Sequence, residues 1–162
     1  MNATTSKLQI TTPSDLEIVM TRDFHFPRAL VWKAWTEPEH VAKWWGCAQS
    51  RTEVCEMDFR PGGAWRFLLH ADGESWGFRG VYREIEAPSR IVNTQVFEPM
   101  PQHEALVTVV FEEYNGVTTM TETLLHTSKE ARDGHLQSGM ETGVAQSLDA
   151  LETLLASLER TI

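Results

Sequence analysis

The sequence has little cysteine, few basic residues and no long apolar run. Cys47 and Cys55 are the only cysteines among 162 residues. Their C-x7-C spacing lacks the short intervals of zinc and redox pairs, so we expect two free thiols. Lys and Arg total 14 against 23 Asp and Glu, and the net charge of −9 argues against nucleic acid as a partner. Because no run of about 18 apolar residues occurs, we also expect no membrane insertion.

Sequence motifs for metals and common cofactors are missing as well. The residues His40, His103 and His135 are scattered and do not show the spacing of paired metal ligands. There is no G-x-S-x-G, no phosphate-binding loop and no dinucleotide fingerprint. We therefore expect no metal and no cofactor, and no motif assigns a catalytic residue.

The first residues are polar and rich in Thr and Ser. They lack the apolar stretch of a secretory signal, so we expect residues 1–16 to be a flexible lead-in and the protein to be cytoplasmic. Residues 17–160 show no internal repeat and predict one domain.

Residues 16–46 predict a strand and two short helices. The stretch LEIVMTRDFHF alternates in the manner of a strand and ends at Pro27, which opens the helical stretch RALVWKAW. Thr36 and Glu39 have the spacing of a capping box for the second helix. Two helices should therefore follow the first strand.

From Arg51 to Thr127, apolar and polar residues alternate between turn signals such as Asn115-Gly116. Cys55 shares its phase with the apolar Met57, which makes it a small core residue rather than a nucleophile. With the opening strand, the pattern predicts about seven strands in an antiparallel sheet with one covered face.

The last segment predicts one long amphipathic helix. Ser138 and Glu141 have the spacing of a capping box at its start. A single apolar stripe follows, so this helix must lie on the sheet. Its members are Val144, Leu148, Leu151, Leu155 and Leu158. We expect an α+β fold in which a bent sheet grips this helix.

Large aromatic and sulfur side chains fall at positions that should face the helix. Rings of this size are hard to pack around one helix without leaving space, which indicates a ligand cavity, although such residues also fill ordinary cores. The expected lining residues are Trp45, Trp65, Phe67, Trp76, Phe78, Phe97, Phe111, Met120, Met140, Val144 and Leu148.

Trp44 and Trp45 are adjacent, and neighbours on a helix point about 100° apart. One should therefore fill the core while the other sits at the rim of the domain. A ring at the rim suits a pocket entrance or a partner surface, for instance for a second copy of the chain.

Glu122 and His126 are the candidate chemical groups, because they share a phase with Met120 and Leu124 on one strand. If that face points inward, Glu122 lies in the cavity, where a desolvated carboxyl can act as an acid or base. The opposite phase is almost as acceptable, and both side chains would then face solvent.

Several blocks in order resemble the START-like SRPBCC superfamily, in its branch of activators of the heat-shock-protein ATPase. They are TRDFHFPRALVWKAWTEPEHVAKWWG, VCEMDFRPGGAWRF, GVYREIEAPSRIV and SKEARDGHLQSGMETG, and the resemblance extends from Ile18 to Ala156. It implies a helix-grip fold, similar to the Bet v type, with a cavity between sheet and helix. Relatives often carry an aromatic residue where this chain has Val144, and this smaller side chain would enlarge the cavity.

The resemblance implies a small hydrophobic ligand, such as a lipid, a polyketide or an aromatic metabolite. Two alternatives stay open: an enzyme similar to polyketide cyclases and aromatases, and a protein-interaction module similar to the co-chaperone of the stress response. The co-chaperone proper has an additional N-terminal domain that has no counterpart in this sequence, so ATPase activation does not follow from the resemblance alone.

Overall fold

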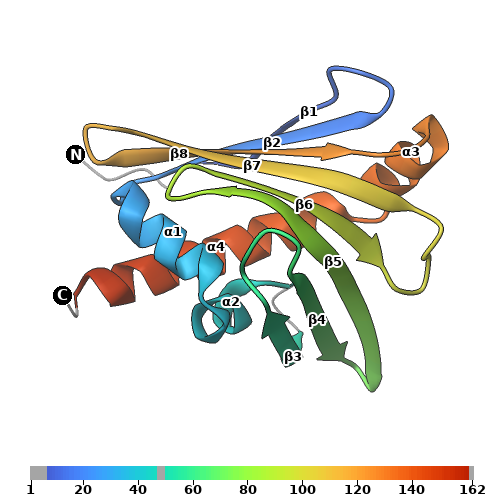
Figure 1. The fold of residues 1–162 in the computed structure, drawn as a ribbon, viewed down its shortest axis with the longest axis horizontal. Coiled ribbons are helices and arrows are strands. Elements are labelled where there is room, and N and C mark those ends of the chain that lie inside the picture. The colour runs from blue at the N-terminus through green and yellow to red at the C-terminus, as the bar shows by residue number, and fades with distance from the viewer. Residues whose placement is uncertain (1–6, 47–49, 161–162) are drawn as a thin grey trace.

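The computed structural model describes residues 7–46 and 50–160 of the chain (Figure 1). Within them, a mixed α and β domain is formed by β1 (Gln9–Thr11), β2 (Glu17–Phe24), α1 (Arg28–Thr36), α2 (Pro38–Trp44), β3 (Arg51–Met57), β4 (Ala64–Ala71), β5 (Glu74–Glu86), β6 (Arg90–Phe97), β7 (Glu104–Tyr114), β8 (Val117–Leu125), α3 (Lys129–Gln137) and α4 (Met140–Glu159).

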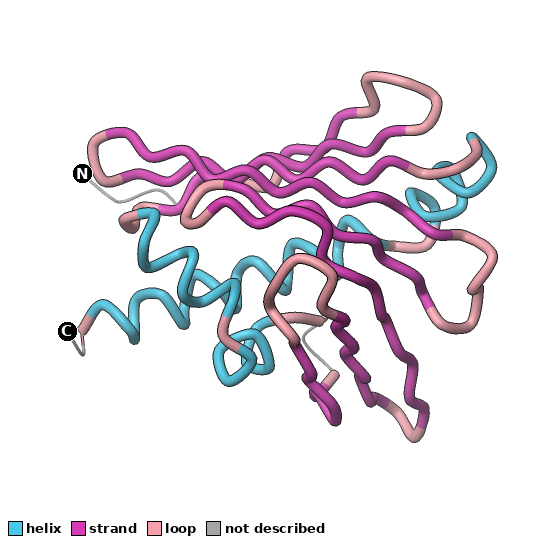
Figure 2. Tube along the Cα trace, viewed as in Figure 1, coloured by secondary structure: helices cyan, strands magenta, loops and turns pink. Residues whose placement is uncertain are grey.

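The strands form one open antiparallel sheet in the order β1-β2-β8-β7-β6-β5-β4-β3. The sheet bends, and α1, α2 and α4 lie inside the bend on one face (Figures 1 and 2). The predicted architecture, a bent sheet around a long C-terminal helix, is confirmed. No helix in the described part of the chain is long and apolar enough to cross a membrane.

The sheet has eight strands rather than about seven. The additional strand is β1, which pairs with β2 between Ile10 and Met20. It lies in the segment that we expected to be a flexible lead-in. A strand of three residues is too short to show a period, so only its pairing partner reveals it.

The core lies between the sheet and α4. Leu151 and Leu155 of α4 are fully buried, as are Phe24 of β2 and Phe111 of β7. Alternate residues of β2 face this core, so the sheet and helix bury their apolar faces against each other.

One of the inward residues of β2 is charged. Arg22 is 2% exposed, and its guanidinium donates to Asp149 Oδ1 at 2.7 Å and to Glu152 Oε1 at 3.1 Å, both on α4. It also lies over the Phe24 ring. These two ion pairs fix α4 against β2. The sequence did not predict them, because an arginine among alternating apolar residues does not reveal which residues it pairs with.

Both predicted capping boxes are wrong. Helix α2 begins after Glu37, and the Thr36 hydroxyl donates to the Trp32 carbonyl instead. At the C-terminal side, Ser128 caps an additional helix, α3, by accepting from the Ala131 N–H. Ser138 is the C-cap of that helix, which ends at Gln137, and its hydroxyl donates to the His135 carbonyl. The short α3 has little apolar character, which is why the sequence did not predict it.

Candidate functional site

A cavity of about 550 Å³ lies between the inner face of the sheet and helices α2, α3 and α4. This volume is within the range of sites for small molecules, about 300–1,000 Å³. Leu69 of β4, Gln95 of β6 and Met20 of β2 all reach it, so its wall extends across most of the sheet. Its floor on α4 includes Ser147, whose hydroxyl donates to the Trp44 carbonyl and so connects α4 to the end of α2.

Most of the residues that we expected at a ligand site line this cavity. They come from α2 and its C-terminal end, the central strands, and α4. They are Trp45, Trp76, Phe78, Phe97, Glu122, His126, Met140, Val144 and Leu148.

The other four expected residues lie elsewhere. Trp65 and Phe67 line a smaller adjoining hollow of about 60 Å³, which shares Trp45 and Glu122 with the main cavity. Phe111 and Met120 are fully buried and opposite each other on β7 and β8. Helix α1 covers this end of the sheet, and Trp35 packs on the Phe111 ring at a centroid distance of 5.2 Å. The same alternating phase therefore faces a cavity at one end of the strands and a filled core at the other.

Both adjacent tryptophans line the cavity, but Trp44 is buried in the core whereas Trp45 is more exposed. Trp44 is 4% exposed and its indole N–H donates to the Ala34 carbonyl at 2.9 Å. Trp45 is half-buried and packs edge-on against Phe67 and Phe78, at centroid distances of 5.0 and 4.9 Å. Phe78 in turn lies 5.0 Å from Phe97, so three rings form a continuous wall. Trp44 has almost no outward surface for a partner protein.

Glu122 points into the cavity, which settles the phase of β8. Its direct neighbours across the sheet are Met20 on β2 and Val109 on β7, each 2% exposed. No hydrogen bond or ion pair reaches its carboxylate from the described residues, which include both neighbouring strands. Burial raises the pKa of this carboxyl to about 7. A group with such a pKa can accept, donate or pair a charge near neutral pH.

A histidine pair closes the end of the cavity beside α3. His126 Nε2 lies 3.1 Å from His135 Nδ1, and one of the two rings donates to the other. Burial, then the neighbouring His103 and Arg132, lower the pKa of His126. Burial, and then the neighbouring His126, lower the pKa of His135 to about 4. Both rings are therefore neutral at neutral pH.

Nothing in the sequence indicated that these histidines lie close together. His103 precedes β7, His126 follows β8 and His135 belongs to the unpredicted α3. All three line the cavity. Residues that meet only through strand order and an unforeseen helix have no recognisable spacing, so no sequence signal was available for the pair.

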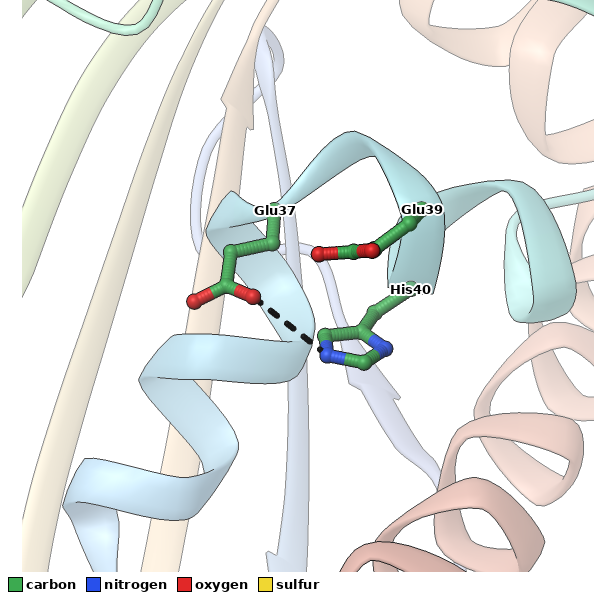
Figure 3. Close-up of side chains that lie close together, drawn as sticks. All are labelled: Glu37, Glu39 and His40. Atoms are coloured by element: carbon green, nitrogen blue, oxygen red, sulfur yellow. Dashed lines mark ion pairs between the residues drawn. The ribbon is translucent and has the colours of Figure 1, made fainter.

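Glu37, Glu39 and His40 form a second polar cluster at the start of α2 (Figure 3), and one ligand atom from each lies within 4.8 Å of the others. His40 Nε2 is 3.4 Å from Glu37 Oε1. Its buried Nδ1 has no partner among the described residues and points away from the carboxylates (Figure 3). Glu39 is exposed and the helix is short, so the cluster is an ordinary helix start with a neighbouring ion pair.

The comparisons with known proteins agree with this architecture. A family model described as Activator of Hsp90 ATPase homolog 1-like protein matches residues 25–156. A solved structure of a protein from Rhodobacter sphaeroides has a TM-score of 0.86 and 24% identity, over 94% of this chain and 99% of that chain. One from Nitrosomonas europaea has a TM-score of 0.81 and 22% identity, over 93% and 100% of the two chains. At these identities the similarity establishes the fold. No curated protein matches the sequence.

Proposed function

This chain belongs to the Activator of Hsp90 ATPase homolog 1-like protein family, and we propose that it binds a small, largely apolar molecule between its sheet and α4. The supporting observation is the cavity of about 550 Å³ with the ring wall of Trp45, Phe78 and Phe97. Protein interiors are close-packed and rarely leave voids much larger than water. A hollow of this size, lined by rings, is therefore best explained by an occupant.

The test is a thermal-shift screen of apolar metabolites, followed by calorimetry on any compound that raises the midpoint. Val144 lines the cavity on α4, so Val144→Trp should fill the space and abolish the shift. Ser157→Trp adds the same ring on the exposed side of the same helix and should leave the shift unchanged. A panel without hits, or a hit that Val144→Trp does not affect, contradicts the proposal.

A second candidate function is acid–base catalysis on the bound molecule, and the observation that favours it is Glu122. A carboxyl whose pKa is raised to about 7 by burial is suited to exchange protons near neutral pH. Here Glu122→Gln should abolish turnover of a bound compound and leave its affinity within about twofold, measured on the same compound. Retained turnover would exclude this role.

A co-chaperone-like contact through the Trp44 and Trp45 pair has less support. Trp44 is buried and its N–H is already bonded, while Trp45 packs against Phe67 and Phe78. The surface that such a contact would use is largely taken up within the domain. We therefore place the binding function in the cavity.

A further inference from the structure

The ionisable side chains that line the cavity are two carboxyl groups and three histidines, His103, His126 and His135. Glu122 and Glu130 are the acidic groups on its wall, and the described lining residues include no Lys or Arg. His126 and His135 complete the wall with neutral rings, since burial lowers the pKa of each. Arg132, a buried cation on α3, donates to the Ser14 carbonyl and to Asp133 and does not line the cavity.

The lack of Lys and Arg among the described lining residues matters most for Glu122, because of where this residue lies. It lies in the middle of β8 between the apolar side chains of Met20 and Val109, and the described residues supply no donor to its carboxylate. Glu122 is half-buried, and a carboxylate largely removed from water without a partner is destabilising, so a donor or cation from the ligand would relieve this. The protein thus offers one charged position for which it provides no counter-charge.

The aromatic wall favours the same kind of ligand. The cavity residues Trp45, Trp76, Phe78 and Phe97 present rings, and Trp45, Phe78 and Phe97 are in mutual contact. Indole and phenyl faces carry partial negative charge and attract ammonium groups, with indole the stronger of the two. A fatty acid or another anionic ligand would instead bring a second negative charge to Glu122.

From these placements we infer that the ligand is a hydrophobic amine, whose ammonium group pairs with Glu122 while its apolar body rests on the Trp45–Phe78–Phe97 wall. This inference rests on the proposed function and specifies its ligand class. It assigns Glu122 a binding role, with the ring wall providing affinity and the carboxylate providing discrimination by charge.

The test uses three probes with one ring system and different polar ends: 1-naphthylmethylamine, 1-naphthylmethanol and 1-naphthoic acid. Calorimetry with the wild-type protein at neutral pH should give at least about tenfold tighter binding of the amine than of the alcohol. The acid should bind more weakly than the alcohol, because it meets Glu122 without a cation.

The matched variants are Glu122→Gln and Glu112→Gln. Glu122→Gln should bring the amine and the alcohol to the same affinity, and it should leave or improve binding of the alcohol. Glu112 is exposed on β7 and does not line the cavity, so Glu112→Gln should preserve the preference for the amine. Circular dichroism and the thermal midpoint of each variant confirm that it is folded.

The experiment distinguishes a failure of the amine specificity from a failure of the proposed binding function. Equal affinity of the wild-type protein for the amine and the alcohol overturns the amine specificity and leaves the apolar cavity intact. A preference for the amine that survives Glu122→Gln overturns the assignment of the carboxylate. Binding of none of the probes also overturns the inference, and the wider panel with Val144→Trp then decides the proposed function independently.

Discussion

Replacing Glu122 by Gln should stabilise the ligand-free protein, and the gain should depend on pH. Burial raises the pKa of this carboxyl from 4.5 to about 7, so the folded state holds its proton more tightly than the unfolded state. Stability contributed by the protonated form is therefore fully present below pH 4.5 and is lost as the pH rises through about 7. Glutamine is neutral throughout and escapes this loss.

The magnitude follows from the size of the shift. Each pKa unit corresponds to about 1.4 kcal/mol, so a carboxylate with a folded pKa of about 7 instead of 4.5 destabilises the protein by at most about 3 kcal/mol at alkaline pH, since the side chain is only half-buried. For a chain of 162 residues this amounts to about 6–12 °C in Tm. The gain from Glu122→Gln should approach zero at acidic pH, where glutamic acid is also neutral.

The assay is urea unfolding of the wild type and the variant at about pH 5 and at about pH 8, with Tm as a second measure. Glu112→Gln is the matched control, because Glu112 is an exposed carboxylate on the neighbouring strand β7. It should change the unfolding free energy by less than about 0.5 kcal/mol at either pH. Equal free energies for the wild type and Glu122→Gln at both pH values would refute the reasoning, since the carboxylate would then be solvated or paired. The case for an ammonium ligand would weaken with it.

Three further outcomes are expected. The pKa of His135 is lowered to about 4, so the stability that its neutral ring contributes is lost as the pH falls from 6.5 towards 4. Over this pH range, urea unfolding should show that the unfolding free energy of His135→Asn falls by up to about 3 kcal/mol less than that of the wild type. Parallel falls in the two free energies would contradict this prediction. Converting both α4 carboxylates that pair with Arg22 to amides should cost about 3–5 kcal/mol in unfolding free energy, and Arg22→Met should cost less, because only the former leaves a buried unpaired charge. Burial raises the pKa of Cys55 to about 11, so a thiol reagent at neutral pH should label Cys55 of a Cys47→Ser variant slowly until urea is added; rapid labelling of the native protein would show that the thiol is accessible.

The main architecture could be predicted from the sequence because its elements carry strong periods. The four-and-three stripe from Val144 to Leu158 and the alternation of the central strands each define a buried face, and burying those faces against each other leaves few arrangements. Elements too short or too polar to show a period, β1 and α3, were missed. These are held by pairing with β2 and by the Ser128 cap, which are contacts rather than patterns.

The site was predictable only in part for the same reason. Alternation identifies which residues face inward, but it does not say where along a strand the interior is filled. Phe111 and Phe97 both belong to inward-facing sets on neighbouring strands, yet one packs on α1 and the other faces the cavity. The difference depends on how far α1 and α4 extend over the sheet. That extent is a property of the assembled domain.

The filled core and the cavity occupy different parts of the domain, so membership of the family, which defines the fold, does not by itself define the ligand. Residues such as Phe111 and Leu155 determine the fold, whereas charge in the cavity is set by Glu122 and by the mouth residue Glu130. A substitution at Glu122 that removed its charge would relieve a buried carboxylate, so the fold alone gives no reason to retain it there. A stability cost of this kind, at a position facing a cavity, is typical of a residue kept for a ligand.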